Sequence, residues 1–291
     1  MKLASTQKLT RLTAIASLSA MWIGCAWDPS RTAVEDVLSA RDFTIRGNSD
    51  LRDGKWQEAE QHFAQAVEAN PEGARARRLY AETLWMRGLH QNAIEQMQEA
   101  AQRAPQDPTL LIRAGEMHLN QENLKLATNY ANQALKLNAK LPAAWALKGN
   151  ILANQGQLDS ALSSYFRALT YHEDSPKIKL AIARIHRSQL QPERALAILD
   201  SMDNQYSDET LFLRGLVLKD LRQYDEAARV FSIVTQNRPG RPEPYFEMAN
   251  IHFQQGNTVN ARLAAEGALR VAPNHDPSRE LISRLDQGAL R

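Results

Sequence analysis

The stretch that decides the fold runs from Pro142 to His172 and reads PAAWALKGNILANQGQLDSALSSYFRALTYH. Its apolar and small residues recur at helical spacings, so it predicts two short helices joined by a turn. One of its alanines belongs to a ladder that runs along the chain: Ala59, Ala93, Ala127, Ala161, Ala195, Ala227 and Ala261. Five of the six steps are 34 residues long, and the step from Ala195 to Ala227 is 32. A period of this size indicates a solenoid of repeated helix pairs.

A second ladder lies twelve residues upstream of the first, and all of its members are small: Gly47, Ala81, Gly115, Gly149, Ala183, Gly215 and Ala249. Numbered so that the ladder alanine is the twentieth residue, seven units are predicted, over residues 40–73, 74–107, 108–141, 142–175, 176–207, 208–241 and 242–275. Each unit predicts a first helix of about twelve residues, a tight turn and a second helix. Residues 276–291 predict a capping helix and tail, with Leu281, Ile282 and Leu285 on one face.

The turn between the two helices of a unit is marked by glycine in some units and by other residues in the rest. Four units have glycine there, at Gly54, Gly88, Gly156 and Gly256, where the left-handed conformation costs no Cβ clash. The third, fifth and sixth units have Glu122, Leu190 and Arg222 instead, so we expect those turns to be built differently.

The fifth unit, residues 176–207, is irregular. It is two residues short, has Leu190 and Pro192 at its internal turn, and has Met202 where the other units favour alanine. We expect its second helix to end early, near Asp203. Two interpretations remain open: a harmless local deletion, or a change of curvature that makes a hinge between units one to four and units six to seven.

The N-terminus has the pattern of an export signal over residues 1–24. Lys2, Lys8 and Arg11 precede an uncharged, mostly apolar run from Leu12 to Ile23, and no acidic residue occurs. That run is shorter than the roughly 20 residues that span a bilayer. We therefore predict a cleaved signal peptide rather than a membrane-spanning helix.

The residues that follow this run, Trp22-Ile23-Gly24-Cys25, resemble the lipobox of bacterial lipoproteins, and Cys25 is the only cysteine of the chain. The resemblance implies that Cys25 is lipidated and becomes the first mature residue. Ala26 resembles the residue found in lipoproteins that reach the outer membrane and face the periplasm. The alternative is ordinary cleavage, which gives a soluble periplasmic or secreted protein. Residues 25–39 then form a short tether and the start of a helix near Arg31, with Val34, Val37, Leu38 and Phe43 on one face.

The units resemble the tetratricopeptide repeat family. The first unit supplies the family's bulky, small, aromatic and proline positions as Phe43, Gly47, Ala59, Phe63, Ala66 and Pro71, and the sixth supplies Leu211, Gly215, Leu218, Ala227, Phe231 and Pro239. The resemblance covers Ala40 to about Pro273 and implies an all-α, right-handed α-solenoid. We expect Phe63, Tyr165 and Phe231 to fill the space beside the small residues. The charged residues at the seventh position, Arg46, Lys148 and Arg214, are expected to point to solvent.

The family also implies a concave groove, lined by the first helices, in which partner peptides or helices bind. Carried over position by position, the groove residues are Arg41, Asn48, Arg75, Arg78, Glu82, Trp85, Leu119, Asn150, Asn154, Arg184, Arg187, Phe212, Phe246, Asn250 and Phe253. Trp85 is either a partner anchor or a contact with a neighbouring unit. Asn150 and Asn154 lie one helical turn apart and are predicted to hydrogen-bond the backbone of a bound peptide.

Sequence motifs for chemistry are missing from the chain. It has no dinucleotide or phosphate-binding loop, no zinc-protease motif and no nucleophile elbow, so we predict no enzyme, cofactor or metal. His118, His186 and His252 fall at the eleventh position of three units, where packing residues are expected, and Trp56 is expected in the core. A formal net charge of +2 gives no sign of the basic surface that nucleic-acid binding requires. The single cysteine excludes an intramolecular disulfide framework.

These observations predict a non-enzymatic scaffold of the bacterial cell envelope, which binds partner proteins during assembly of an envelope or secretion complex. An alternative is a regulatory or substrate-presenting subunit of an enzyme for envelope polysaccharide or peptidoglycan. A third is a structural solenoid that associates with itself. The sequence leaves the partner and the oligomeric state open.

Overall fold

The chain is α-helical throughout the part that the computed structural model describes, residues 29–202 and 207–289. The helices are α1 (Pro29–Arg52), α2 (Trp56–Ala69), α3 (Ala74–Met86), α4 (His90–Arg103), α5 (Pro108–Asn120), α6 (Leu124–Leu137), α7 (Pro142–Asn154), α8 (Leu158–Leu169), α9 (Pro176–Ser188), α10 (Pro192–Asp200), α11 (Asp208–Asp220), α12 (Tyr224–Asn237), α13 (Pro242–Gln254), α14 (Thr258–Val271) and α15 (Asp276–Ala289). The predicted signal peptide, residues 1–24, and Cys25 lie outside the described residues.

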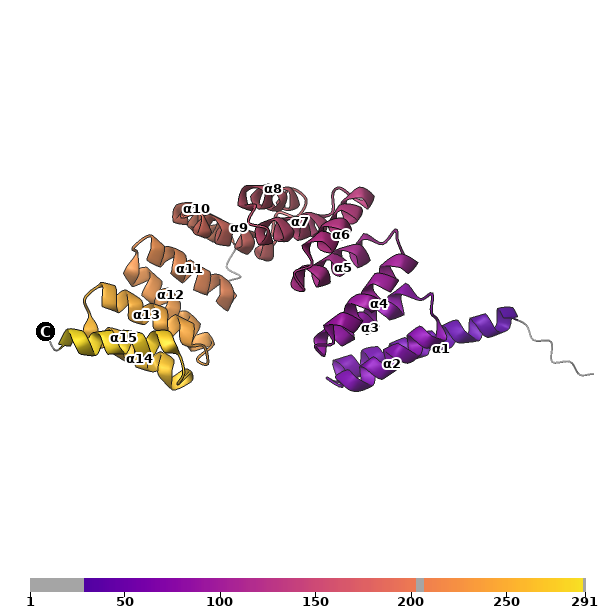
Figure 1. Ribbon diagram of the computed structural model, residues 1–291, viewed down its shortest axis with the longest axis horizontal. Helices are drawn as coiled ribbons and strands as arrows, with labels where there is room; N and C mark the ends of the chain where they lie inside the picture. The colour runs from indigo at the N-terminus through magenta and orange to yellow at the C-terminus, as the bar shows by residue number, and fades with distance from the viewer. Residues whose placement is uncertain (1–28, 203–206, 290–291) are drawn as a thin grey trace, which may run out of the picture.

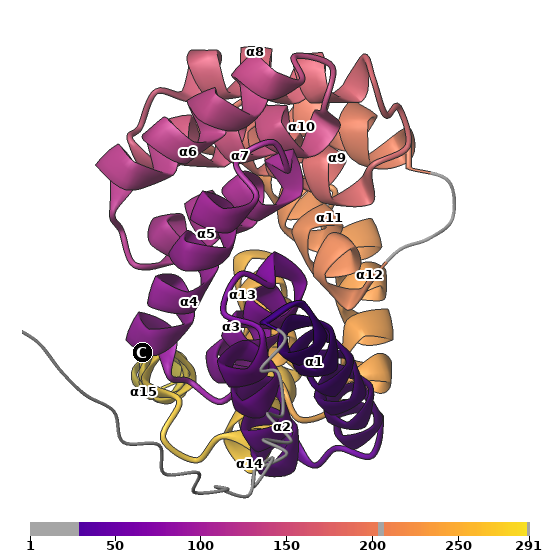
Figure 2. The ribbon, with the colours of Figure 1, turned by 90° about the vertical axis from the view of Figure 1, so that its right-hand side faces the viewer.

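Successive helices pack as antiparallel pairs, and the pairs stack side by side into an arch (Figure 1). In that view α5, α7 and α9 lie on the inner side of the arch, and α8 and α10 lie on its outer crest. Seen after a quarter turn, both arms descend from the crest, so that the first and last helices lie below it (Figure 2). The predicted fold class, an all-α solenoid of helix pairs, is confirmed.

Local signals explain where the helices begin. From the second to the seventh unit, the first helix starts at the unit's first residue. At α5, Asp107 precedes Pro108, and its carboxylate accepts a hydrogen bond from the Thr109 backbone N–H at 2.9 Å. Proline at the first helical position loses no hydrogen bond, and the aspartate satisfies one of the free N–H groups, so the junction favours a new helix there.

The core depends on close approach between the two helices of a unit. The seven ladder alanines are fully buried. A Cβ added to Gly149 would lie 2.6 Å from Tyr165 Cε1, and one added to Gly215 would lie 2.6 Å from Phe231 Cε1. Gly47 is related to Phe63 in the same way, at 2.7 Å. The prediction that these aromatic rings fill the space beside the small residues is confirmed.

The prediction that turns without glycine are built differently is wrong. Glu122, Leu190 and Arg222 have φ angles of 58°, 56° and 59°, in the same left-handed region as the turn glycines. The backbone hydrogen bonds also match: Asn123 N–H donates to His118 C=O at 2.8 Å, as Gln157 N–H donates to Leu152 C=O at 2.9 Å. The packing of the two helices determines the turn geometry. A residue with a side chain at this position therefore adopts the left-handed conformation in spite of its energetic penalty.

Helix α1 differs from the prediction at its N-terminal end. It begins at Pro29, two residues before the start predicted near Arg31, and runs for 24 residues to Arg52. Its first half extends beyond α2 (Figure 1). Val34, Val37 and Leu38 there are 52–60% exposed, and Ile45 is 57% exposed, whereas Phe43 is half-buried on the side that packs. We call Val34, Val37, Leu38 and Ile45 the α1 stripe; it is an exposed apolar surface.

The fifth unit is shortened as expected. Its second helix, α10, has nine residues and ends at Asp200, three residues before the predicted end. Met202 is 5% exposed and packs into the core cluster of this unit, where it replaces the smaller alanine of other units. The hinge interpretation stays a prediction.

Two predictions about side-chain exposure fail in part. Trp56 begins α2 and is 41% exposed, so it is not a core residue. Arg46 is exposed as expected, but the Lys148 and Arg214 side chains are half-buried. Lys148 lies over the Trp145 ring, and Arg214 is hydrogen-bonded to Asp200. Neighbouring side chains hold these two cations against the protein.

The alanine ladder can be tested by overpacking. Because Ala161 is fully buried, we expect Ala161→Leu to destabilise the protein by about 1–3 kcal/mol. Thermal unfolding followed by circular dichroism measures this. Ala143→Leu, at an exposed position of the same unit, is the matched control and should leave the melting temperature unchanged. Equal melting temperatures for the two variants would contradict the packing role of the ladder.

The left-handed turns predict a substitution that stabilises the protein. Leu190 has a φ of 56° and a side chain that is 89% exposed, so Leu190→Gly removes strain and loses no packing. We expect a gain of about 1 kcal/mol, since glycine removes the left-handed penalty but adds freedom to the unfolded chain. Leu190→Ala keeps the Cβ and should give no gain. If both variants melt at the same temperature, the turn is not strained.

Candidate binding groove

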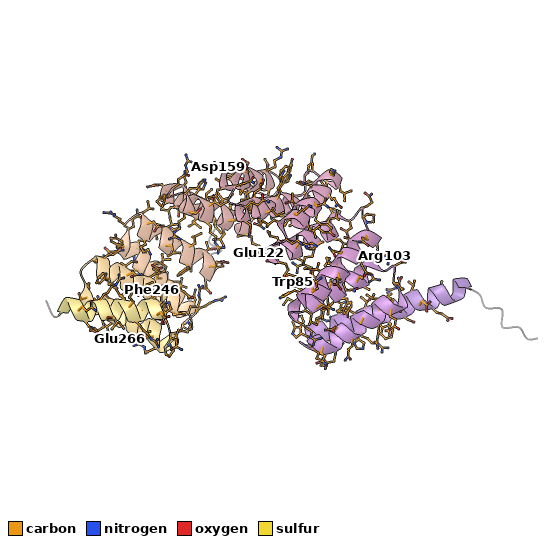
Figure 3. All side chains as sticks on the ribbon, viewed as in Figure 1. Trp85, Arg103, Glu122, Asp159, Phe246 and Glu266 are labelled. Carbon is orange, nitrogen blue, oxygen red and sulfur yellow. The ribbon has the colours of Figure 1, made fainter. Side chains whose placement is uncertain are left out.

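The inner side of the arch is the candidate binding surface. Trp85 and Glu122 lie on this side, whereas Arg103 and Asp159 lie on the outer side (Figure 3). The first helices of the middle units, α5, α7 and α9, form this inner side (Figure 1). Six of the predicted groove residues occur at three places: Glu82 and Trp85 at the first, Asn150 at the second, and Arg184, Arg187 and Phe212 at the third.

The first place is where α3 meets α5. Arg113 of α5 donates from Nε and Nη2 to both Glu82 oxygens, at 2.8 and 2.7 Å, and its guanidinium lies 5.9 Å from the centre of the Trp85 ring. Its Nη1 also bonds Glu116 at 3.1 Å. These bonds, that to Glu82 above all, raise the pKa of Arg113.

Trp85 itself is half-buried. Its ring lies 4.4 Å from that of His90 and packs against the core cluster of the second and third units. The sequence left two interpretations of Trp85 open, a partner anchor or a contact with a neighbouring unit. The structure shows the second, because Arg113 of the third unit lies over the Trp85 ring. Sequence reasoning missed Arg113, although glutamate at the ninth position of two successive units, Glu82 and Glu116, is a signal for a cation between them.

The second place is a hollow of about 480 Å³ between the third, fourth and fifth units, lined by Glu116, Asn150, Tyr165 and Lys177 among others. The Tyr165 hydroxyl donates to Asn150 Oδ1 at 2.6 Å, so the side-chain oxygen predicted to bind a peptide already has a partner in the chain. Burial raises the pKa of Tyr165 to about 12. Tyr165 therefore stays a neutral donor at physiological pH.

The third place is a hollow of about 610 Å³ where the fifth and sixth units meet, which we call the arginine hollow. Arg184 and Arg187 of α9, Phe212 of α11, and Arg238 and Arg241 of the connection from α12 to α13 line it. Three predicted groove residues, Arg184, Arg187 and Phe212, are thus brought together from two units.

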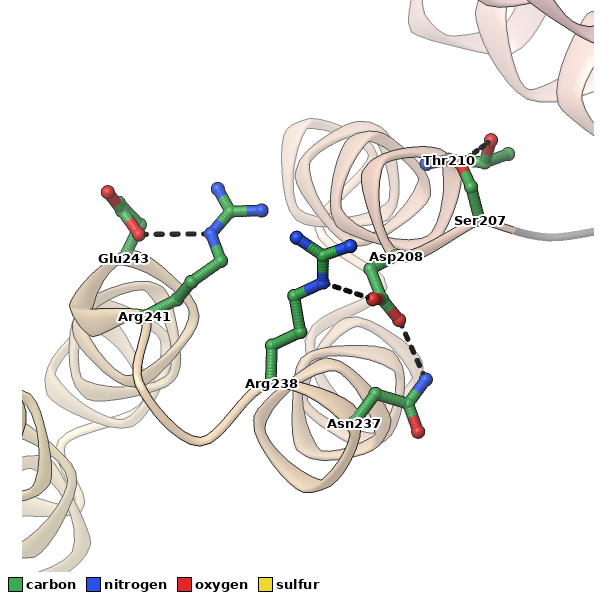
Figure 4. A network of polar contacts seen from close by, with 7 residues as sticks. All are labelled: Ser207, Asp208, Thr210, Asn237, Arg238, Arg241 and Glu243. Atoms are coloured by element: carbon green, nitrogen blue, oxygen red, sulfur yellow. Dashed lines mark hydrogen bonds and ion pairs between the residues drawn. The ribbon is translucent and has the colours of Figure 1, made fainter. Parts of the chain in front are cut away.

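Acidic side chains hold these arginines in place (Figure 4). Arg238 Nε donates to Asp208 Oδ2 at 2.7 Å, and Asn237 Nδ2 donates to Asp208 Oδ1 at 2.8 Å. Hydrogen bonds from Asn237 and then Arg238 lower the pKa of Asp208. Arg241 lies 5.1 Å from the centre of the Phe212 ring. Sequence reasoning missed Arg238 and Arg241, since both lie outside the helices.

Arg184 and Arg187 of the arginine hollow are also ion-paired. Arg187 Nε donates to Asp220 Oδ2 at 2.6 Å, and Arg184 pairs with Glu209. Both of these contacts join residues of α9 to residues of α11. The hollow is therefore organised by ion pairs across the junction between two units.

The other predicted groove residues differ in exposure, and their place in a groove stays a prediction. Arg41, Arg75, Arg78, Asn154 and Phe253 are exposed, while Asn48, Leu119, Phe246 and Asn250 are half-buried. Phe246 lies 5.4 Å from the His275 ring and packs against the last core cluster, which includes α15. Asn48 donates to Thr44 C=O of its own helix at 2.7 Å. The apolar C-terminal end is thus partly covered by the chain.

Two of the three eleventh-position histidines are packing residues. His118 and His186 are 4% and 6% exposed, and His118 stacks on Tyr130 with ring centres 5.6 Å apart. Burial lowers the pKa of His118. His252 is half-buried. Within residues 29–202 and 207–289 no three His, Cys, Asp or Glu side chains gather as a metal site would require, and each helix is too short or too polar to span a bilayer.

A solenoid of short helix pairs with a charged and aromatic inner surface is a class of protein that serves as a protein-protein interaction scaffold. The chain belongs to the tetratricopeptide repeat family: the family model matches residues 46–108, 112–178 and 212–276, more than half of the chain. The residues between the second and third matches include most of the irregular fifth unit.

Solved structures share the fold at low sequence identity. A tetratricopeptide repeat protein from Parabacteroides merdae is 16% identical with a TM-score of 0.65, over 85% of this chain and 99% of its own. The Pseudomonas aeruginosa protein pilF is 16% identical with a TM-score of 0.62, over 76% and 99%. YrrB, described as a TPR protein with an unusual peptide-binding site, is 20% identical with a TM-score of 0.54, over 64% and 97%.

A curated relative, the human protein O-mannosyl-transferase TMTC1, is 22% identical over 200 residues. The match covers 69% of this chain but spans only about a fifth of the relative's length.

Proposed function

We propose that this protein is a non-enzymatic scaffold of the bacterial cell envelope that binds a partner peptide or helix in its inner groove while an envelope or secretion complex assembles. The observation that carries the proposal is the arginine hollow. It lies on the inner surface, it joins two units, and it places guanidinium groups beside an aromatic ring.

The chemistry of the hollow suits a protein segment. A partner with acidic side chains can bond the free N–H groups of Arg184 and Arg187, since each guanidinium has five donors and one ion pair leaves some unused. Phe212 and Leu216 offer an apolar surface for a neighbouring side chain of the same segment. YrrB has an unusual peptide-binding site of its own, which supports the proposal through the shared fold alone.

The groove can be tested by photo-crosslinking in living cells. We expect a crosslinking amino acid at Leu216, in the arginine hollow, to trap a partner, and the same amino acid at Asn132, on an exposed face of α6, to trap far less. Arg184→Ala with Arg187→Ala should lower the Leu216 adduct about fivefold or more, because charge-assisted bonds are lost.

The matched control is Arg194→Ala with Arg229→Ala, which removes two exposed arginines from α10 and α12. Adducts that form equally from Leu216 and Asn132, or that persist in the Arg184 and Arg187 variant, would reject the groove. Trp85 is less suitable for this test, since its packing against the core would mix binding with stability.

The location that we propose is the periplasmic face of the outer membrane, with lipid on Cys25. Helix α1 begins at Pro29, four residues after Cys25. A tether of that length spans at most about 14 Å. A lipid anchor would therefore keep the start of α1 close to the membrane surface, with the first half of that helix between the membrane and the first unit.

Lipidation is tested by metabolic labelling and fractionation. We expect the parent protein to incorporate radioactive palmitate and to sediment with outer membranes. Cys25→Ser should take up no label and leave the membrane fraction. Ala26→Asp is the matched variant: it keeps the label but changes the residue that resembles the outer-membrane sorting position. An unlabelled parent protein found in the periplasmic extract would establish the soluble alternative.

A further inference from the structure

The fourth unit has a second hollow, away from the groove. It has a volume of about 510 Å³ and is lined by Trp145, Lys148 and Leu152 of α7 and by Ser160, Ser163 and Arg167 of α8. The α7 residues stand at the fourth, seventh and eleventh positions of the unit, which are not groove positions. We call this the unit-four hollow.

Aromatic rings hold two cations at the unit-four hollow. Lys148 Nζ lies 5.3 Å and the Arg167 guanidinium 5.8 Å from the centre of the Trp145 ring, and Arg167 also lies 5.6 Å from that of Tyr171. Trp145 is fixed in turn, because its indole N–H donates to Ala139 C=O at 2.8 Å. Cations held in this way lose little freedom when an anion binds.

These two cations differ from the others that contact rings in the described part of the chain. Arg46, Arg113 and Arg241 each also pair with a carboxylate, of Asp42, Glu82 and Glu243 respectively. Neither Lys148 nor Arg167 forms an ion pair with a described residue, and no acidic side chain lines the hollow. Two like charges on one ring, without a counter-charge, favour an anion from outside.

We propose that the unit-four hollow binds an acidic sugar unit, with its carboxylate or phosphate between Lys148 and Arg167. Its volume falls within the range of about 300–1,000 Å³ for small-molecule sites. Leu152 gives an apolar wall for a sugar ring beside the Trp145 ring, over which the two cations lie. The Ser163 hydroxyl already donates to Asp159 C=O at 3.0 Å, so its oxygen remains an acceptor for a sugar hydroxyl.

An acidic peptide is the less suitable occupant. Its carboxylate would satisfy the two cations, but it would bring no ring for the wall and no set of hydroxyls for the serines. The hollow is separate from the groove residues, so a sugar and a partner protein can bind together. The proposal therefore does not depend on what the groove binds.

The test is titration calorimetry on the purified full-length protein at low ionic strength, with glucuronate, glucose, inorganic phosphate and triglutamate as separate ligands. We expect glucuronate to bind, and glucose, which lacks the charge, to bind at least about tenfold more weakly. The double substitution Lys148→Gln with Arg167→Gln should weaken the binding of glucuronate by about tenfold or more. Lys136→Gln with Arg229→Gln removes two cations of α6 and α12 that lie outside the hollow and should change nothing.

Before their affinities are compared, thermal melting followed by circular dichroism checks that both double variants are folded. The proposal is overturned if glucuronate does not bind, or if the Lys148 and Arg167 variant binds it as tightly as the parent. Phosphate that binds as tightly as glucuronate would indicate a simple anion site without sugar recognition. Triglutamate that binds more tightly than glucuronate would assign the hollow to an acidic protein segment instead.

Discussion

The structure depends on the close approach of the two helices of each unit at a small residue of the first helix, and in three units a ring of the second helix, Phe63, Tyr165 or Phe231, fills the space beside it. At Gly149 no Cβ fits, because Tyr165 occupies the space. The contact fixes how the two helices of a unit cross, and its repetition stacks the units at a regular angle. The arch, its inner surface and the turn geometry all follow from it. Even the turns at Glu122 and Leu190 adopt the left-handed conformation that the helix packing requires.

The ladder made the fold predictable, because each ladder residue marks a contact that every unit repeats. The ladder does not reach residues 29–39, which precede the first unit, and there the helical spacing of Val34, Val37 and Leu38 predicted the start of α1 to within two residues. The groove residues followed from the family resemblance. Arg113 and Arg238 did not, because their positions depend on charges in a neighbouring unit, at Glu82 and Asp208, rather than on the period.

Ion pairs between successive first helices recur along the groove. Arg113 bonds Glu82, Arg187 bonds Asp220, and Lys219 bonds Glu247 at 2.5 Å. Surface pairs of this kind contribute little to stability. They do fix the side chains that a partner meets, so the inner surface presents ordered charges rather than mobile ones. Salt screens such charges, and contacts made through the groove should therefore weaken as ionic strength rises.

The two ends of the array are finished differently. Helix α15 covers the C-terminal end, where Leu281 and Leu285 are buried, whereas the α1 stripe leaves apolar side chains uncovered at the N-terminal end. An array with two bare ends could join head to tail without limit and grow into a fibre. With α15 over the C-terminal end, a contact between copies through the α1 stripe would join N-terminal end to N-terminal end, and a self-complementary contact of that kind closes at two copies. The capping helix would in that case limit growth as well as solvate the core.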